Sequence, residues 1–259
     1  GCEHLFVRSQ DEVALVEALT LMGLTQKEIS ARSGVPLGTV RNWQRGRIPG
    51  ITPRARRSPR PRPPAPTPAA LRTWTYSYLL GFYLGDGCIT RQSNGSWLLR
   101  IVSDAAYPHL LNEARLAMED VSCGKAWQRK RPHQNAFEIG LTWWHWPSVF
   151  PQHGPGRKHG RPIYLADWQR EIVEADPRPF LRGLIHSDGW RGVNRVFVKG
   201  KHYEYPRYQF SNRSQDIKDL FCWACDLLGV EWRPWARHHI SVARRDSVAK
   251  LDEFIGPKR

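Results

Sequence analysis

Two aspartates occupy equivalent places in two similar stretches of the chain. Asp86 ends the stretch LLGFYLGD (79–86), Asp188 ends FLRGLIHSD (180–188), and a glycine follows each. Both stretches predict apolar helices, and a helix C-terminus is negative, so an isolated carboxylate is disfavoured there. If the two ends meet, one carboxyl must stay protonated or a cation must lie between them. Mg²⁺ suits such a pair, because it binds carboxylates together with water and phosphate oxygens.

Small residues recur at helical spacing along both stretches. Gly81 and Gly85 lie four positions apart in the first stretch, and Gly183 and Ser187 lie four apart in the second. Residues four apart share one face of a helix, where ordinary side chains hold packed helices about 8–10 Å apart. Small residues permit less separation, so the sequence predicts two helices whose backbones approach closely.

The segments that follow the two stretches have the same order. Each stretch is succeeded by two strand-like runs, a helix, two more strand-like runs and a closing helix, and the first pair of strands turns at Asn94-Gly95. In the first half we expect a helix at about 105–121, strands near 125–131 and 136–142, and a closing helix within 164–176. In the second half the corresponding segments are 190–200, 204–212, 214–228, 231–237, 239–244 and 246–254. Each half therefore predicts the order αββαββα.

The paired stretches and this order resemble the LAGLIDADG family in its single-chain, two-motif form, over residues 72–259. The resemblance implies an α+β fold, a pseudo-twofold tandem αββαββα arrangement with a saddle of antiparallel strands, in halves of about 72–176 and 177–259. It also implies a homing endonuclease that hydrolyses a phosphodiester in each strand of double-stranded DNA with Mg²⁺ or Mn²⁺. By position, Asp86 and Asp188 are the catalytic acids, and they bind the metal together with Gly85 and Ser187.

The chain departs from the family consensus two places before each catalytic acid. The consensus has an acid there, whereas this chain has Leu84 and His186. A histidine on the side of a packed helix is expected to be structural, although a metal ligand is the alternative. The resemblance also places polar groups at strand ends near the acids, and a rough alignment assigns these auxiliary roles to Asp104, Asn212, Arg131 and Arg237.

Polar and basic residues alternate along both hairpins that follow the motifs. This pattern suits a sheet with one face on a core and the other on a nucleic-acid groove, and a merely solvated face is the alternative. The expected DNA contacts are Arg91, Gln92, Trp97 and Arg100 in the first hairpin and Lys199, Lys201, Arg207 and Gln209 in the second. In the loop at 143–162, Arg157, Lys158 and Arg161 are expected to meet phosphates.

Residues 1–46 predict a small all-α domain of helix-turn-helix type. Thr25 and Glu28 form a capping-box pattern at the start of one short helix, and Gly34 permits the turn to a second helix. The pattern resembles resolvase-like and repressor-like domains, in which the second helix lies in the major groove. A helical bundle without a DNA role is the alternative. The resemblance implies DNA contacts from Thr39, Arg41, Asn42, Gln44, Arg45 and Arg47.

Residues 47–71 form a linker rich in proline and arginine. Proline blocks helix and central strand, so this segment is expected to be extended. It is either a passive spacer or an arm that follows phosphates or enters the minor groove. The arm interpretation adds DNA contacts from Arg54, Arg56, Arg57, Arg60 and Arg62.

Composition limits the classes of function. The 259 residues carry a formal net charge of +15, which favours a polyanionic partner, usually nucleic acid, with a basic membrane-surface protein as the weaker alternative. The family resemblance implies that this partner is double-stranded DNA. No apolar run approaches the roughly 18 residues of a membrane span. The five cysteines lack the spacing of a zinc site or a disulfide framework, so Cys222 and Cys225 are expected to be core residues. We expect a cytoplasmic monomer with internal pseudo-twofold symmetry, associated with the nucleoid if the source is bacterial.

Two alternatives to a nuclease remain open from the sequence. A LAGLIDADG fold that has lost catalysis would serve as a transcription regulator, and a helix-turn-helix fused to it fits that role. An intron maturase, which binds RNA, is the weaker alternative. The sequence does not specify the target site.

Overall fold

The computed structural model describes residues 9–48, 64–198 and 200–256 of the chain. The chain divides into two compact units, residues 1–63 and 64–259, and each is described by itself. Lys199 and the arginines of the expected arm, Arg54, Arg56, Arg57, Arg60 and Arg62, lie outside the described residues. None of the helices within these ranges is long and apolar enough to cross a membrane.

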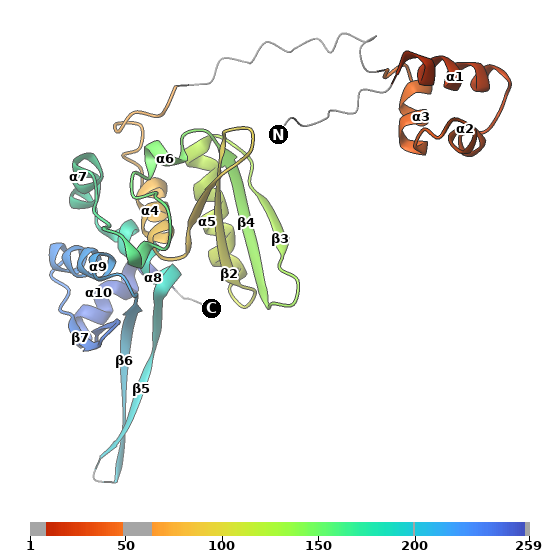
Figure 1. Ribbon diagram of the computed structural model, residues 1–259. Coiled ribbons are helices and arrows are strands. Elements are labelled where there is room, and N and C mark those ends of the chain that lie inside the picture. The colour runs from red at the N-terminus through yellow and green to blue at the C-terminus, as the bar shows by residue number, and fades with distance from the viewer. Residues whose placement is uncertain (1–8, 49–63, 199, 257–259) are drawn as a thin grey trace. The chain divides into compact units, whose positions relative to one another are not determined.

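Over residues 9–48 the first unit has three short helices, α1 (Gln10–Leu21), α2 (Gln26–Ser33) and α3 (Leu37–Gln44) (Figure 1). Thr25 and Glu28 form the capping box that starts α2, and Gly34 ends it with a positive φ of 68°. Ile29, Val40 and Trp43 are buried in a core of the unit's own. The turn between α2 and α3 therefore depends on the capping and glycine signals that the sequence contains.

The second unit contains the tandem repeat (Figure 1). Its first half has the order α4 (Trp74–Asp86), β1 (Cys88–Arg91), β2 (Trp97–Asp104), α5 (Pro108–Ser122), β3 (Trp127–Lys130) and β4 (Ala136–Trp143), and it closes with α6 (Trp146–Val149), the 3-10 turn η1 (Lys158–Gly160) and α7 (Asp167–Ala175). Its second half has the order α8 (Arg178–Asp188), β5 (Gly189–Val198), β6 (Lys201–Ser211), α9 (Gln215–Leu227), β7 (Arg233–Ala236), β8 (His239–Val242) and α10 (Arg245–Ile255). The predicted αββαββα tandem is confirmed.

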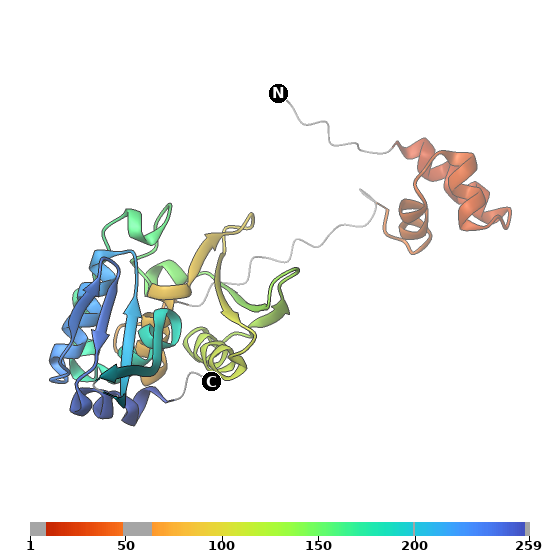
Figure 2. The ribbon, with the colours of Figure 1, turned by 90° about the horizontal axis from the view of Figure 1, so that it is seen from below.

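Each half builds one antiparallel four-stranded sheet with the same connectivity, β1-β2-β4-β3 in the first and β5-β6-β8-β7 in the second. The helices α4 and α8 lie between the two sheets (Figures 1 and 2). One apolar core joins both halves, and it includes Leu99 and Ile139 from the first sheet and Phe210 and Ile240 from the second. The second hairpin is longer than the first, because β5 and β6 pair from Gly189 to Val198, well past the strands beside them.

The close approach of α4 and α8 depends on two glycines. A Cβ atom at Gly81 would lie 2.2 Å from the carbonyl oxygen of Phe180, and one at Gly183 would lie 2.1 Å from that of Tyr78. Real Cβ atoms do not approach backbone so closely, so each glycine admits the backbone of the other helix. The small-residue spacing thus has the packing role that the sequence predicts.

A partly buried polar cluster also ties the two halves together. Arg182 on α8 donates Nε–H to Glu113 on α5, at 2.8 Å, and donates to the carbonyl of Phe254 at the end of α10, at 2.6 Å. His186 is 2 % exposed, with Nε2 2.8 Å from the carbonyl of Ile255 and Nδ1 3.1 Å from the Tyr78 hydroxyl. Because a carbonyl only accepts, Nε2 carries a proton, and in the neutral ring Nδ1 then accepts from the Tyr78 hydroxyl. These contacts favour the structural role expected for His186 over metal ligation.

We predict that Gly81→Ala and Gly183→Ala each lower the free energy of unfolding by about 3 kcal/mol or more, because the new methyl group meets backbone that cannot move aside. Urea unfolding of each purified variant measures this. Gly160→Ala is the control, since a Cβ there meets nothing within 4 Å. Equal stability of all three variants would show that the helices are not in close contact.

The start of the long hairpin is held to α10 by an ion pair that should make stability depend on acid. Arg191 donates two hydrogen bonds of 2.8 Å to Asp252, and the Tyr208 hydroxyl donates a third of 2.6 Å. The bonds from Arg191 and then Tyr208 lower the pKa of Asp252 below its ordinary value. A carboxylate whose folded pKa is depressed stabilises the fold above its unfolded pKa, near 3.9, and loses this contribution as the pH falls through the folded pKa.

We therefore predict that Asp252→Asn destabilises the protein at pH 6 and that its difference from wild type shrinks towards pH 3. Urea midpoints measured across this range test the prediction. The neighbouring Glu253→Gln serves as the control, because Glu253 is exposed and forms no ion pair among the described residues, whereas Asp252 is paired with Arg191. A difference between Asp252→Asn and wild type that is constant with pH would contradict the linkage.

Candidate active site at the ends of two paired helices

The C-terminal ends of α4 and α8 lie against each other. A Cβ atom at Gly85 would lie 2.1 Å from the Ser187 hydroxyl oxygen and 3.0 Å from a carboxylate oxygen of Asp188. Asp86, the next residue after Gly85, is exposed, and Asp188 is half-buried. The hydroxyl of Ser187 donates back into its own helix, 3.0 Å from the carbonyls of Gly183 and Leu184. The helix pair therefore brings the two motif ends, and the acids they carry, to one place.

A lysine from the segment between the halves reaches the end of α4. The ammonium of Lys158 donates to the carbonyls of Gly85 and Gly87, at 2.8 and 2.9 Å, and also to that of Tyr83. Lys158 is half-exposed as a residue, but its ammonium is buried. Burial lowers the pKa of Lys158 to about 8, and the negative charges of Asp188 and then Asp86 act in the opposite direction. A cation on the last carbonyls of a helix offsets the negative end of the dipole. Lys158 thus makes this helix end tolerable for a carboxylate.

Asn212 approaches the second acid. Its amide donates to a carboxylate oxygen of Asp188 at 2.6 Å. The same side chain accepts at 2.8 Å from the backbone N–H of Ser214, the N-cap of α9, so the amide orientation is fixed from both sides. An open hollow here is lined by residues that include Gly85, Lys158, Asp188, Asn212 and Arg213. The carboxylate of Asp188 therefore accepts from a neutral amide and also acts on the ammonium of Lys158, more strongly than Asp86 does.

The donor set at this hollow suits a hard divalent cation that keeps water ligands. Within the described part of the chain, no group of three or more His, Cys, Asp or Glu residues could hold a metal ion. Mg²⁺ does not need such a cage, since one or two carboxylates, water and substrate phosphate satisfy it. Asp86 and Asp188 would hold it. The carbonyl of Gly85 already accepts from Lys158, and the Ser187 hydroxyl donates within its helix.

The other three auxiliary candidates also lie at the C-terminal ends of strands, at the sheet ends that correspond to the position of Asn212. The hydrogen bonds that place them are not with the motif acids. Asp104 caps the turn after β2, where its carboxylate accepts from the N–H of Ala106 at 2.9 Å and from the Asn135 amide at 3.2 Å. Arg131 follows β3 and is bonded through its backbone to Ala136. Arg237 lies in the turn between β7 and β8, where its carbonyl accepts from Lys218 at 2.9 Å.

The register of the hairpins explains why Asp104 and Asn212 differ. Gly189 pairs with Phe210 in the second hairpin, two residues before Asn212, and Cys88 pairs with Arg100 in the first. Extending the first register by one pair places Gly87 opposite Ile101, so that the equivalent of Asn212 is Ser103. Asp104 is one residue further along.

We call the face of each sheet that points away from the apolar core its open face. In the first sheet, Arg100 lies on the open face, because its neighbours Leu99 and Ile101 are buried in the core. Trp97 lies on the core side, where its ring is 4.8 Å from that of His153. Arg91 pairs with Trp97 and shares its side at the strand end, and Gln92 is in the turn. Of the four expected contacts in this hairpin, only Arg100 projects from the open face.

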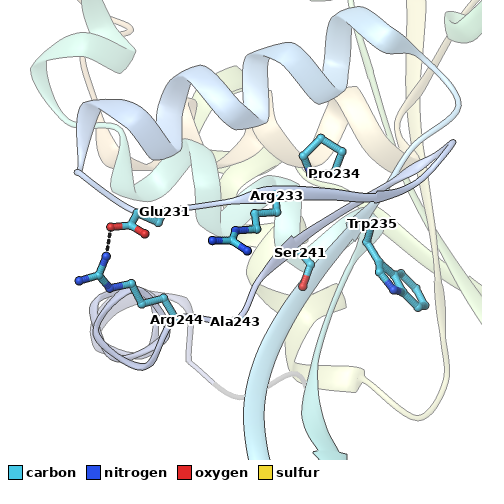
Figure 3. Close-up of a pocket in the computed structure, with 7 residues that line it drawn as sticks. All are labelled: Glu231, Arg233, Pro234, Trp235, Ser241, Ala243 and Arg244. Atoms are coloured by element: carbon cyan, nitrogen blue, oxygen red, sulfur yellow. Dashed lines mark hydrogen bonds and ion pairs between the residues drawn. The ribbon is translucent and has the colours of Figure 1, made fainter.

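The open face of the second sheet is richer in such residues. Lys201, Arg207 and Gln209 alternate with the core residues Tyr208 and Phe210, so the three share this face. Trp235 of β7 is 59 % exposed, and the Arg207 guanidinium lies 5.8 Å from its ring centroid. Arg233, which pairs with Ser241, lines a hollow at the edge of this sheet with Trp235 and Arg244 (Figure 3).

In the first unit, the expected DNA contacts lie on and after α3. The side chains of Arg41, Asn42, Gln44, Arg45 and Arg47 are exposed, and Thr39 is half-buried. Gln44 donates to the Thr20 hydroxyl at 3.0 Å and accepts from Gln26 at 2.9 Å. The helix therefore presents a polar outer face, part of which is braced by α1 and α2.

Two features of the site differ from what the sequence predicts. Lys158 and Arg161 were expected to meet phosphates, but Lys158 donates to the end of α4, and Arg161 donates to the carbonyls of Gln152 and Gly156 at 2.9 and 3.0 Å. Glu138, which was not expected at the site, is 5 % exposed on the open face of the first sheet. In β4, Glu138 stands between the apolar residues Phe137 and Ile139, and this alternation indicates that Glu138 lies on the open face. No local pattern indicates the position of Lys158.

We predict that Lys158→Met lowers the free energy of unfolding by about 1–3 kcal/mol, because three carbonyls at the end of α4 lose their donor. Arg157→Met is the matched control, since Arg157 is the exposed neighbour. Urea unfolding at pH 7 distinguishes the variants. A Lys158→Met protein as stable as Arg157→Met would show that the ammonium does not hold this helix end.

No family model and no curated protein matches the chain. Solved structures that it resembles include variants of the homing endonuclease I-DmoI, at 13% identity and a TM-score of 0.48 over 73% of this chain and 98% of that one. They also include the LAGLIDADG homing endonuclease I-LtrWI bound to target DNA, at 8% and 0.46 over 73% and 85%, and the LAGLIDADG meganuclease I-AabMI bound to uncleaved DNA, at 14% and 0.43 over 68% and 81%. These similarities are too weak to assign a role to any residue. The fold is therefore established by the chain's own element order, and the site by its own contacts.

Proposed function

We propose that the protein is a sequence-specific, metal-dependent DNA endonuclease of LAGLIDADG type. The observation that carries the proposal is the contact between the two motif ends, where Gly85 adjoins Asp188 and Lys158 lies near both acids. Two carboxylates at the base of two sheets with basic open faces suit phosphodiester hydrolysis on a duplex. The formal net charge of +15 supports a polyanionic substrate.

The residues of the site have distinct roles under this proposal. Asp86 and Asp188 would hold Mg²⁺ or Mn²⁺, which would supply charge neutralisation at phosphate and a water of lowered pKa. Asn212 orients the carboxylate of Asp188 through its 2.6 Å bond. Lys158 offsets the negative end of α4, so that the acids remain compatible with the approach of a phosphate.

The helix-turn-helix unit adds a second DNA contact under this proposal. Arg41 and Asn42 of α3 are exposed, as a recognition helix requires. Tethering two DNA-binding units raises the local concentration of the second without a new contact, provided that the linker can span the two sites. Arg54, Arg56, Arg57, Arg60 and Arg62 in that linker remain proposed phosphate contacts.

Cleavage of DNA enriched by the protein from a randomised duplex library tests the function. We predict that wild type cuts the enriched duplex in both strands with Mg²⁺ or Mn²⁺ and not with EDTA. Asp86→Asn and Asp188→Asn should each slow cutting by at least about 100-fold, because the stabilisation of transition-state charge by a metal is worth several kcal/mol. Binding of the same duplex should be largely retained.

Asp167→Asn is the matched control, since Asp167 is an exposed acid in the first turn of α7 and belongs to no part of the proposed site. It should cut at close to the wild-type rate. Wild-type protein that binds the enriched duplex tightly but never cuts it would indicate the regulator instead. Cutting that survives in both motif variants would refute the assignment of the active site.

A further inference from the structure

A carboxylate lies in the middle of the open face of the first sheet, where the proposed function places DNA. Glu138 on β4 is 5 % exposed, and Arg129 on β3 is its direct partner in register. One carboxylate oxygen of Glu138 accepts from Nε and Nη2 of Arg129, at 2.9 and 2.7 Å. Its other oxygen lies 3.7 Å from Nη1 of Arg100 on β2. The acid is thus covered by two arginines and does not itself face the duplex.

An indole ring supports the same guanidinium from below. The guanidinium carbon of Arg129 lies 5.0 Å from the ring centroid of Trp127, within the range of a cation–π contact. Trp127 lies across Gly140, where a Cβ atom would be 2.2 Å from the ring. The absence of a side chain at Gly140 therefore leaves room for the indole, and the indole packs against the guanidinium.

These contacts fix the orientation of Arg129 without using all its donors. Glu138 occupies Nε–H and one hydrogen of Nη2, so that Nη1 and the second hydrogen of Nη2 remain at the far edge of the fork. The side chain of Arg129 is 62 % exposed, so this edge is accessible. A fixed guanidinium edge matches the two adjacent acceptors of guanine, O6 and N7, which the major groove displays.

We propose that Arg129, held by Glu138 and Trp127, reads a guanine in the major groove of the target. Glu138 is a positioning residue here, because it acts through Arg129. The inference rests on the proposed function, in that the open faces must bind duplex DNA. It adds which residue specifies a base and which base it specifies.

The second sheet contains a natural comparison. Arg207 also lies over an indole, that of Trp235, at 5.8 Å. No acid forms an ion pair with Arg207 among the described residues, and its Nε has no hydrogen-bond partner there. Its guanidinium has a ring beneath it but no carboxylate to set its rotation. We therefore expect Arg207 to contribute charge to phosphate contact and not to select a base.

Selection from a randomised duplex library, followed by sequencing, tests this with wild type, Arg129→Lys, Glu138→Gln and Arg207→Lys. Arg129→Lys keeps the charge and loses the fork. In Arg129→Lys and Glu138→Gln, one guanine of the wild-type consensus should be lost. Wild type should prefer the consensus duplex over a duplex changed at that base pair, and in these two variants this preference should fall by roughly 10- to 100-fold, the range expected for one bidentate base contact. Arg207→Lys should keep the full consensus.

Thermal unfolding of each variant identifies misfolding, and Arg129→Lys, at an exposed side chain, remains decisive if Glu138→Gln does not fold. A full consensus in Arg129→Lys would overturn the inference. So would loss of a cytosine in Glu138→Gln with the guanine retained, because Glu138 would then read the base itself. A wild-type protein that enriches no sequence would overturn the proposed function as well, whereas an enriched consensus that is unchanged in the variants would overturn this inference alone.

Discussion

The contact between the backbones of α4 and α8 determines most of the second unit. Gly81 and Gly183 each occupy a place where a methyl group would collide with the opposite backbone. Because the helices can approach this closely, their C-termini lie side by side. The first strand of each sheet begins directly after one of these ends, at Cys88 or Gly189. The position of the acids and the position of the sheets therefore have a common origin.

This arrangement is electrostatically unfavourable, and different donors offset the unfavourable charge at the two helix ends. Two helix C-termini and two carboxylates at one place are mutually unfavourable. At the end of α4 the ammonium of Lys158 contributes positive charge, although burial lowers its pKa to about 8. At Asp188 the amide of Asn212 supplies a neutral donor. Lys158 acts on both acids, Asp188 more than Asp86, so one residue of the segment between the halves serves both sides of the pseudo-twofold site.

Local signals in the sequence predicted the fold well. The repeat of a glycine-containing helix ending in Asp-Gly predicted the helix pair, and the capping box at Thr25 with Gly34 predicted the turn of the first unit. The charge of the open faces followed from alternation in the second hairpin, where Lys201, Arg207 and Gln209 do share a side.

The remaining parts depend on information that local patterns do not contain. Lys158 contacts residues more than seventy positions earlier in the chain. The side to which Arg91 and Trp97 turn depends on the register of a short hairpin, and a shift of one residue exchanges the two faces. The same shift separates Asp104 from the position that corresponds to Asn212. Glu138 was recognisable by alternation, but its meaning depends on Arg129 lying opposite it on another strand.

The central claim is that the two motif acids form one site. The direct measurement is anomalous diffraction at the manganese edge from crystals of the protein with its enriched duplex and Mn²⁺. We predict manganese in contact with both Asp86 and Asp188, beside a phosphate of the duplex. Manganese that contacts neither carboxylate, or aspartates that face separate regions of the molecule, would contradict it.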